Sequence, residues 1–378
     1  MSHTRAALTI EVLDRSTAIR RLPDALDELA TRALEPNVFY ESGLFIPALQ
    51  HIDVHLPLWI VCFRNAAGVL QGVVPLVREP LRRGFPVKIL RNWVHRFCFL
   101  GTPILDARCA HQVLDALATW LASGAAPTGG IEWVNVSWDG PFGQLLRQIF
   151  SPSHAWITHV TTYQRAVLKR QRDITSPISG KHAKDLRRLE RRMAAHGSVD
   201  YKVMQQDEDW QPWYDDFLSV EASGWKGEEG SAIRSSPADI AFFRSVLQHA
   251  HACGQLQLLR LTVAGKAVAM KLNLRSRGES YSLKIGYDDA YAQFSPGVLL
   301  ECFNIKVFEL EPDSMRRMDS CAGENHPMIN RLWSDRREIA TVTLARHGLL
   351  LRALVRAKQI ALRLKQALHT RQHQRDTP

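Results

Sequence analysis

A strand, a loop and a helix start follow one another over residues 280–301, and this segment carries the most informative chemistry in the sequence. Apolar and polar side chains alternate up to Tyr287, which predicts a half-buried antiparallel strand. A helix then opens at Pro296 and Gly297, with Ser295 at the expected N-cap position. Free backbone N–H groups and the helix dipole at such a start favour an anion such as a pyrophosphate. Ordinary helix capping explains the same residues, so both interpretations stay open here.

Other patterns that could carry chemistry give weaker signals. Residues 207–209 fit the Asp-x-Asp pattern of metal-dependent glycosyltransferases, but Asp209 stands where the N-cap of the next helix is expected. The histidine pairs 51/55 and 249/251 lack a third ligand at suitable spacing, so no metal site is predicted. The six cysteines show no C-x-x-C spacing, and no Gly-x-Ser-x-Gly elbow occurs. The sequence therefore predicts neither a redox pair nor a covalent nucleophile.

The elements that must position this segment are predicted to occur twice. In the first half the periodicity predicts helices over 17–33 and 44–51, a hairpin 58–63/69–77, strands 87–90 and 97–100, a helix 108–121, a strand 131–138, a helix 142–150 and a strand 156–168. In the second half it predicts a strand 199–204, helices 210–221 and 237–253, a hairpin 256–263/267–274, a strand 280–287, a helix 297–310, a strand 315–320, a helix 328–333 and a strand 338–344. The two orders match, which indicates an internal duplication.

Composition is that of an ordinary globular protein, with 378 residues of which 46% are hydrophobic. This excludes disordered, collagen-like and disulfide-scaffold classes. No apolar stretch approaches the roughly 18 residues that a spanning helix needs, and the first 16 residues lack the apolar core of a signal peptide. We therefore expect a cytoplasmic protein with reduced thiols.

The net charge of +10 is concentrated in residues 78–96, 164–192 and 346–378, where basic residues exceed acidic ones by 5, 7 and 7. Such a band attracts phosphates, acidic glycans, tRNA or anionic lipid by the same Coulomb steering, and solvated helix faces give the same pattern. Residues 345–374 predict a basic amphipathic helix. It can pack on the protein or a partner, or lie peripherally on a membrane beside a polysaccharide assembly.

Residues 256–308, together with the Glu221-to-Gly227 string, resemble GNAT-superfamily acetyltransferases of the CelD/FemAB-like type that accompany bacterial exopolysaccharide genes. The most specific pieces are Trp225-Lys226, residues 281–288 and residues 294–297. The resemblance implies an α/β (α+β) fold of two tandem GNAT-like (acyl-CoA N-acyltransferase) domains with mixed, largely antiparallel sheets. The implied divisions are a domain 1–165, a basic connector 166–197, a catalytic domain 198–345 and a tail 346–378.

The resemblance also implies an acyl-CoA donor whose thioester lies along residues 284–287 and whose pyrophosphate sits at the helix start. The implied donor-binding residues are Gln293, Phe294, Ser295, Gly297 and Val298. The sequence departs from the general Arg/Gln-x-x-Gly-x-Gly/Ala loop, because Pro296 and Val298 stand at its two small-residue positions. FemAB-like relatives use aminoacyl-tRNA instead, and the basic residues of 181–192 could serve tRNA phosphates equally well.

The implied reaction is direct attack of an amine or hydroxyl on the donor carbonyl. Candidate catalytic residues are the bases Glu221, Asp319 and Glu324, with Tyr287 as an acid. Trp225, Lys226 and Lys284 are candidates for binding the acceptor. Each also has a structural interpretation as a helix-end ion pair, a turn former or a solvent-facing charge.

The sequence thus predicts an acyltransferase that acts on an amine or hydroxyl of a sugar, amino sugar or cell-envelope precursor, with acyl-CoA as donor and no metal. Two alternatives remain: an aminoacyl-tRNA-dependent transferase of the FemAB kind, and a non-catalytic protein that binds nucleic acid or an envelope complex. The acceptor is a small molecule or a glycan in the first interpretation. The acyl group and the oligomeric state are not predicted.

Overall fold

The computed structural model describes residues 8–81, 87–151, 154, 156–170, 180–223, 232–346, 353, 355–357 and 360. The chain divides into two compact units. Unit 1 takes its described residues from Met1–Glu35, His55–Tyr163 and Glu338–Pro378, and unit 2 from Pro36–Val54 and Gln164–Arg337. The units do not follow chain order, because an early segment belongs to unit 2 and the last strand belongs mainly to unit 1.

Unit 1 contains a sheet with the strand order β1-β2-β3-β4-β6-β13-β7, and β5 pairs with β3. Its strands are β1 (Thr9–Leu13), β2 (Leu58–Arg64), β3 (Leu70–Pro80), β4 (Lys88–Asn92), β5 (Ile104–Leu105), β6 (Gly130–Ser137), β7 (Ile157–Lys169) and β13 (Asp335–Ala345). Its helices are α1 (Arg15–Arg21), α2 (Pro23–Ala30), α4 (Ala110–Ala122) and α5 (Pro141–Ile149). The core forms where α4 and α5 cover the sheet, and there the rings of Trp133 and Phe142 meet edge to face at 5.3 Å.

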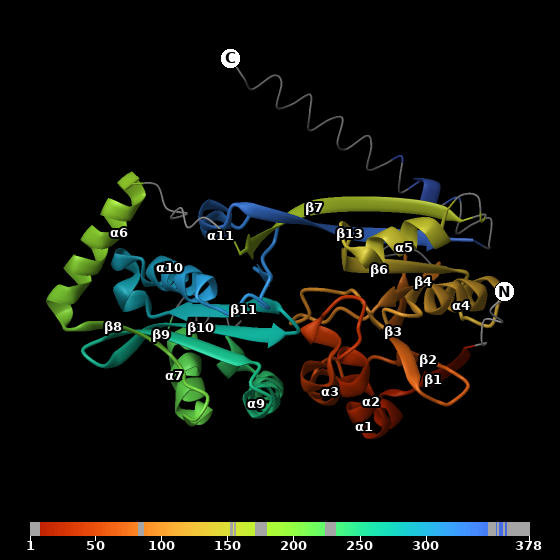
Figure 1. Cartoon of the computed structure of the whole chain (residues 1–378), viewed down its shortest axis with the longest axis horizontal. Helices are drawn as coiled ribbons and strands as arrows, with labels where there is room; N and C mark the ends of the chain where they lie inside the picture. Colours follow the sequence, from red (N-terminus) through yellow and green to blue (C-terminus); the bar gives the residue numbers. More distant parts are fainter. Residues whose placement is uncertain are drawn as a thin grey trace, which may run out of the picture. The chain divides into compact units, whose positions relative to one another are not determined.

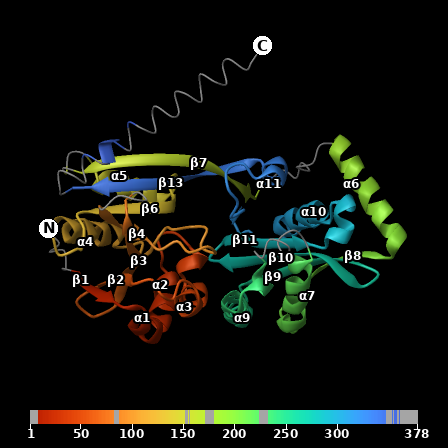
Figure 2. The same ribbon diagram turned by 180° about the vertical axis from the view of Figure 1, so that it is seen from behind.

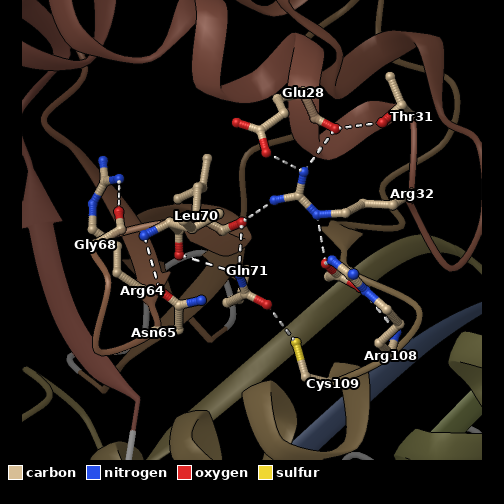
Figure 3. A network of polar contacts seen from close by, with 12 residues as sticks. Glu28, Thr31, Arg32, Arg64, Asn65, Gly68, Leu70, Gln71, Arg108 and Cys109 are labelled. Atoms are coloured by element: carbon tan, nitrogen blue, oxygen red, sulfur yellow. Dashed lines mark hydrogen bonds and ion pairs between the residues drawn. The ribbon is translucent and has the colours of Figure 1, made fainter.

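A polar network ties the loop after α2 to β3 and to the start of α4 (Figure 3). Arg32 donates to the Asp106 carboxylate at 2.5 Å and to the Leu70 carbonyl at 2.8 Å. Arg108 binds the same carboxylate at 2.7 Å, and Asp106 itself is fully buried. Burial works to raise the pKa of Asp106, but the hydrogen bonds from Arg108 and Arg32 outweigh it and lower that pKa to about 2. The buried Asp106 carboxylate therefore stays charged, and through its arginine partners it holds the loop after α2 against β3 and the start of α4.

Unit 2 contains the sheet order β7-β12-β11-β10-β9-β8, of which β7 contributes its last residues. Its other strands are β8 (Val199–Val203), β9 (Leu256–Val263), β10 (Lys266–Ser276), β11 (Glu279–Tyr287) and β12 (Arg317–Asp319). Its helices are η1 (Val38–Tyr40), α3 (Ser42–His51), α6 (Gly180–Met193), η3 (Ala194–His196), α7 (Trp210–Ala222), η4 (Ile233–Ser235), α9 (Pro237–Ala252), η5 (Asp289–Phe294), α10 (Pro296–Glu309) and α11 (Pro327–Leu332). Helices α7 and α9 lie on one face of β8–β11 and α10 on the other (Figures 1 and 2).

The order of elements from β1 to β7 recurs from β8 to β13, as the sequence predicts. Each series holds one parallel pair within a largely antiparallel arrangement, β4 with β6 and β11 with β12. In the second series β12 pairs with β11 only from Glu279 to Tyr281, whereas β11 continues to Tyr287. The predicted fold class, an α/β (α+β) protein with mixed sheets, is confirmed.

Two local predictions are wrong, and one strand was missed. The helix expected over residues 17–33 is divided into α1 and α2 at Leu22, because Pro23 has no N–H to continue the first helix. Residues 97–100 form no strand, and β1 was not predicted. Most of the tail expected as an amphipathic helix, residues 345–374, lies outside the described residues. Within the described part of the chain, no helix is both long and apolar enough to cross a bilayer.

Candidate functional site

A cavity of about 470 Å³ lies in unit 2 where the end of β11 meets the start of α10. Four elements or their flanking loops wall it: α7, β11, the η5–α10 junction and α11. Its lining residues are Glu221, Ile285, Gly286, Tyr287, Asp289, Ala292, Ser295, Pro296, Gly297, Val298, His326, Pro327 and Met328. The wall is largely apolar, with a few polar groups at defined places, which is typical of a small-molecule site.

The start of α10 differs from an ordinary capped helix. Ser295 adopts left-handed backbone angles, φ 53° and ψ 50°, and its side chain makes no cap hydrogen bond, so the predicted capping role is wrong. Its carbonyl instead accepts from Val298 N–H at 3.0 Å and Leu299 N–H at 3.1 Å. Gly297 follows Pro296 in the first turn, and a Cβ built on it would stand 3.3 Å from the Tyr287 ring. Ser295 and the positive end of the helix dipole therefore border the cavity, and no side chain caps the helix start among the described residues.

Glu221, which lines another part of the wall, forms a buried ion pair with Lys284. Lys284 Nζ lies 2.5 Å from Glu221 Oε1, and Ile233 N–H donates to Oε2 at 2.9 Å. The Glu221 side chain is fully buried, whereas that of Lys284 is 14% exposed. A Cβ at Gly286 would stand 3.1 Å from Glu221 Cα, so glycine lets α7 approach β11 closely enough to place this carboxylate.

The structure places some of the predicted donor-binding residues on the cavity wall and others away from it. Ser295, Gly297 and Val298 line the cavity, as does Tyr287. Phe294 is buried in the hydrophobic cluster beneath α10, and Gln293 is exposed on η5. Neither of these two lines the cavity.

The other predicted catalytic and acceptor-binding residues lie elsewhere or outside the described residues. Asp319 is fully buried, accepts from Arg337 at 2.8 Å and lies 3.5 Å from Arg165. Burial opposes the charged form, but the two guanidinium groups hold the pKa of Asp319 below its usual value. Glu324 is exposed, and its carbonyl accepts a hydrogen bond from Asn330. Neither acid lines the cavity. Trp225 and Lys226 lie outside the described residues.

Sequence reasoning missed His326, Asp289 and Met328 in the cavity wall. His326 is the N-cap of α11, and its Nδ1 accepts from Ile329 N–H at 3.3 Å. The signal that was present is His326-Pro327, a capping residue followed by proline at the first helical position. Nothing in that pattern says that the helix borders a cavity.

Sequence reasoning also missed a buried hub behind the cavity. The Glu301 carboxylate on α10 accepts from Lys271 at 2.7 Å, Asn304 at 2.9 Å and the Trp333 indole at 3.1 Å. Lys271 on β10 also donates to Ser282 on β11 at 2.6 Å. The hub therefore connects α10, β10, β11 and the residue after α11, and two of these, α10 and β11, border the cavity.

Comparison with known proteins agrees with this architecture. Residues 180–303 match the family described as the acetyltransferase (GNAT) domain. This part of the chain is therefore similar to GNAT acetyltransferase domains. The protein is accordingly a transferase. The matched segment contains Glu221, β11 and the start of α10. No curated protein matches the chain.

Solved structures share the fold over most of the chain. A conserved protein of unknown function from Bacteroides thetaiotaomicron has a TM-score of 0.56 at 10% identity, covering 89% of this chain and 100% of its own. L-PGS from Bacillus licheniformis has a TM-score of 0.52 at 12% identity, covering 89% and 96%. FemX has a TM-score of 0.51 at 8% identity, covering 88% and 96%. At these identities the likeness concerns the fold alone.

Among the described residues, no group of three or more His, Cys, Asp or Glu is placed to hold a metal ion.

Proposed function

We propose that the protein transfers an acetyl or other acyl group from acyl-CoA to an amine or hydroxyl of a sugar, amino sugar or cell-envelope precursor. The observation that carries the proposal is the cavity formed where β11 runs on past its pairing with β12 and meets the start of α10. The acetyltransferase match covers this region. The glycan or envelope acceptor is inferred from the family resemblance of the sequence.

The residues present fit the phosphate end of such a donor. Helix α10 has 14 residues, and its N-terminus carries a partial positive charge that favours a pyrophosphate. Gly297 leaves one position of the first turn without a side chain, and the Ser295 hydroxyl is not used for capping. When bound, acyl-CoA would supply a thioester carbonyl that is open to attack by the acceptor. Ile285, Gly286 and Tyr287 supply the strand along which its pantetheine arm would lie.

Within the cavity, Glu221 and Tyr287 are the predicted catalytic residues that the geometry supports. Each oxygen of a carboxylate offers two acceptor sites, so Glu221 can hold Lys284 and Ile233 N–H and still accept the proton of an attacking amine or hydroxyl. Lys284 positions that carboxylate. The Tyr287 hydroxyl serves as the acid that protonates the leaving thiolate. Asp319, held by two arginines away from the cavity wall, is assigned a structural role in this proposal.

A second candidate, an aminoacyl-tRNA-dependent transferase, is favoured by one observation. The helix α6 presents exposed cations next to η5, which leads into the cavity. The donor experiment below therefore includes a charged tRNA.

The test is a calorimetric titration of the full chain with acetyl-CoA. Replacing Gly297 with Asp places a carboxylate at the phosphate site, and we expect donor affinity to fall by about tenfold or more, roughly 1.4 kcal/mol of repulsion. Gly297→Ala adds a side chain without a charge, so comparing it with Gly297→Asp separates the effect of bulk on donor affinity from the effect of charge. Ala238→Asp is the matched control, because Ala238 is exposed and follows Pro237 at the start of α9 just as Gly297 follows Pro296. Unchanged affinity in Gly297→Asp contradicts the donor site, and binding of charged tRNA without acetyl-CoA selects the second candidate.

A further inference from the structure

The helix α6 lies at the rim of unit 2, next to α10 and just before the edge strand β8 (Figures 1 and 2). Its packing side is apolar, because Leu186 and Met193 are buried in a hydrophobic cluster of unit 2. With about 100° between successive residues, Lys184, Arg188 and Arg191 fall within an arc of about 60° on the opposite side of the helix. All three are exposed. We name these three residues the α6 outer row, which faces away from the body of unit 2.

The acidic residues of α6 do little to neutralise this row. Glu190 is half-buried, and its carboxylate interacts with the Tyr201 side chain on β8. Asp185 pairs with Arg188 at 3.7 Å, but both side chains are more than half exposed, and an ion pair of that kind is weak in water. Lys184 and Arg188 are like charges four residues apart, which destabilise a helix. The row therefore keeps most of its positive charge, at some cost to the stability of the helix.

The form of the α6 outer row indicates a flat anionic partner. Its three cations extend over about 10 Å along the helix axis and share one direction, so a planar surface can meet all of them at once. The row lies on a convex helix and does not line the cavity described above. Residues 180–193 contain no Phe, Tyr or Trp on which a base could stack, and no Asn or Gln to read a base edge. These observations favour a lipid surface over a nucleic acid.

We propose that the α6 outer row docks the protein on the surface of a bilayer that contains anionic lipid. Each lysine or arginine held near such a surface strengthens binding by about fivefold, because the headgroups give the membrane a negative potential. The apolar side of α6 is already buried in unit 2, so the helix contributes charge but no apolar side chains that insert into the lipid. Docking is therefore peripheral, reversible and sensitive to salt. The inference goes beyond the proposed function and does not depend on which donor the cavity binds.

The experiment measures how much of the full chain sediments with vesicles of phosphatidylcholine, with and without about 30% phosphatidylglycerol, at roughly 50 and 200 mM salt. The test variant is Lys184→Gln/Arg188→Gln/Arg191→Gln. We expect the parent to bind only the vesicles with phosphatidylglycerol, and to bind them more weakly at the higher salt concentration, because salt screens the attraction. With three cations removed, the test variant should bind these vesicles between about tenfold and 100-fold more weakly than the parent at low salt.

Two further variants identify the cause of any loss. The matched control Lys202→Gln/Arg244→Gln/Lys306→Gln removes the same charge from exposed positions of β8, α9 and α10, and its vesicle affinity should stay within about threefold of the parent. Arg188→Lys/Arg191→Lys keeps the charge and should bind like the parent, because attraction to a charged surface does not need the planar guanidinium group. Urea unfolding midpoints within experimental error of the parent verify that the variants are folded.

Several results would overturn the inference. A parent that does not bind the anionic vesicles, or a test variant that binds them as the parent does, shows that the α6 outer row is not a membrane contact. Equal losses in the test variant and the matched control show that only net charge matters. A loss in Arg188→Lys/Arg191→Lys indicates a specific site for a single phosphate instead of docking on a surface. A test variant that keeps vesicle binding but loses affinity for tRNA assigns the row to nucleic acid. The donor site is tested separately, by the acetyl-CoA titration.

Discussion

The buried pair of Lys271 and Glu301 allows a quantitative test of how the cavity walls are held together. The two side chains are 1% and 0% exposed, and Glu301 also accepts from Asn304 and Trp333. Replacing Lys271 with Met removes the cation and leaves a fully buried carboxylate without its counter-charge. Breaking one partner of a buried ion pair costs about 3–5 kcal/mol. We expect the free energy of unfolding to fall by that amount.

The compensating variant distinguishes the ion pair from a simple packing defect. In Lys271→Met/Glu301→Gln the buried charge is gone, while a glutamine carbonyl can still accept from Asn304 and Trp333. Most of the lost stability should return, giving a coupling energy of about 2–4 kcal/mol. Lys266→Met is the matched control on the same strand, because Lys266 is 70% exposed and its ion pair with Asp288 contributes about 1 kcal/mol at most.

Urea unfolding followed by both fluorescence and circular dichroism measures these differences, and coincidence of the two probes checks that a single transition is observed. With a slope of about 2 kcal/mol per molar, Lys271→Met should lower the midpoint by roughly 1.5–2.5 M. A Lys271→Met midpoint equal to that of Lys266→Met would refute the reasoning. So would a double variant no more stable than Lys271→Met alone.

Two further predictions concern titration and thiol reactivity. The pKa of Asp106 is lowered in the folded state to about 2, so its contribution to stability is present above the unfolded value near pH 4 and disappears as pH falls toward 2. Thermal unfolding should therefore show that Asp106→Asn is less stable than the parent at pH 7, with a difference that shrinks by pH 2; a constant difference would show that charge is not the cause. Cys253 is exposed, whereas burial raises the pKa of Cys62 and Cys302 to about 12. Native labelling with a chromogenic disulfide should modify Cys253 first, and an unchanged fast phase in Cys253→Ser would contradict this.

Local patterns were sufficient to predict most elements of the fold. The alternation of apolar and polar residues over 280–287 and the proline at 296 mark β11 and the start of α10 within one residue. The repeated order of elements was also visible in the sequence, because each half carries its own hairpin and crossover helix. Membership of the compact units was not visible. Residues 338–344 were predicted as the last strand of the second half, yet this strand pairs with β6, since register with a distant strand leaves no local signature.

The candidate site was predictable only where chemistry coincides with a local signal. Gly297 and Ser295 were found because a helix start has a recognisable sequence. Glu221 and Asp319 looked alike as acids near element ends, and only the structure separates them: one lies on the cavity wall, whereas the other is enclosed by arginines. His326 and Glu301 depend on contacts between residues about 30 or more positions apart, which a single sequence does not reveal.

The assignment of β13 to the sheet of unit 1 has a consequence for how the protein is made. In sheet order this strand lies between β6 and β7, although the ribosome begins to synthesise it about 165 residues after β7 is complete. During synthesis, unit 1 therefore lacks this strand, and the backbone N–H and C=O groups of β6 that pair with β13 are exposed. Unpaired strand edges of this kind are a typical cause of aggregation. If the first half of the gene were expressed alone, the sheet of unit 1 would stay incomplete. The two halves should instead recover a folded protein when produced together, because the missing strand can then be supplied by the second polypeptide.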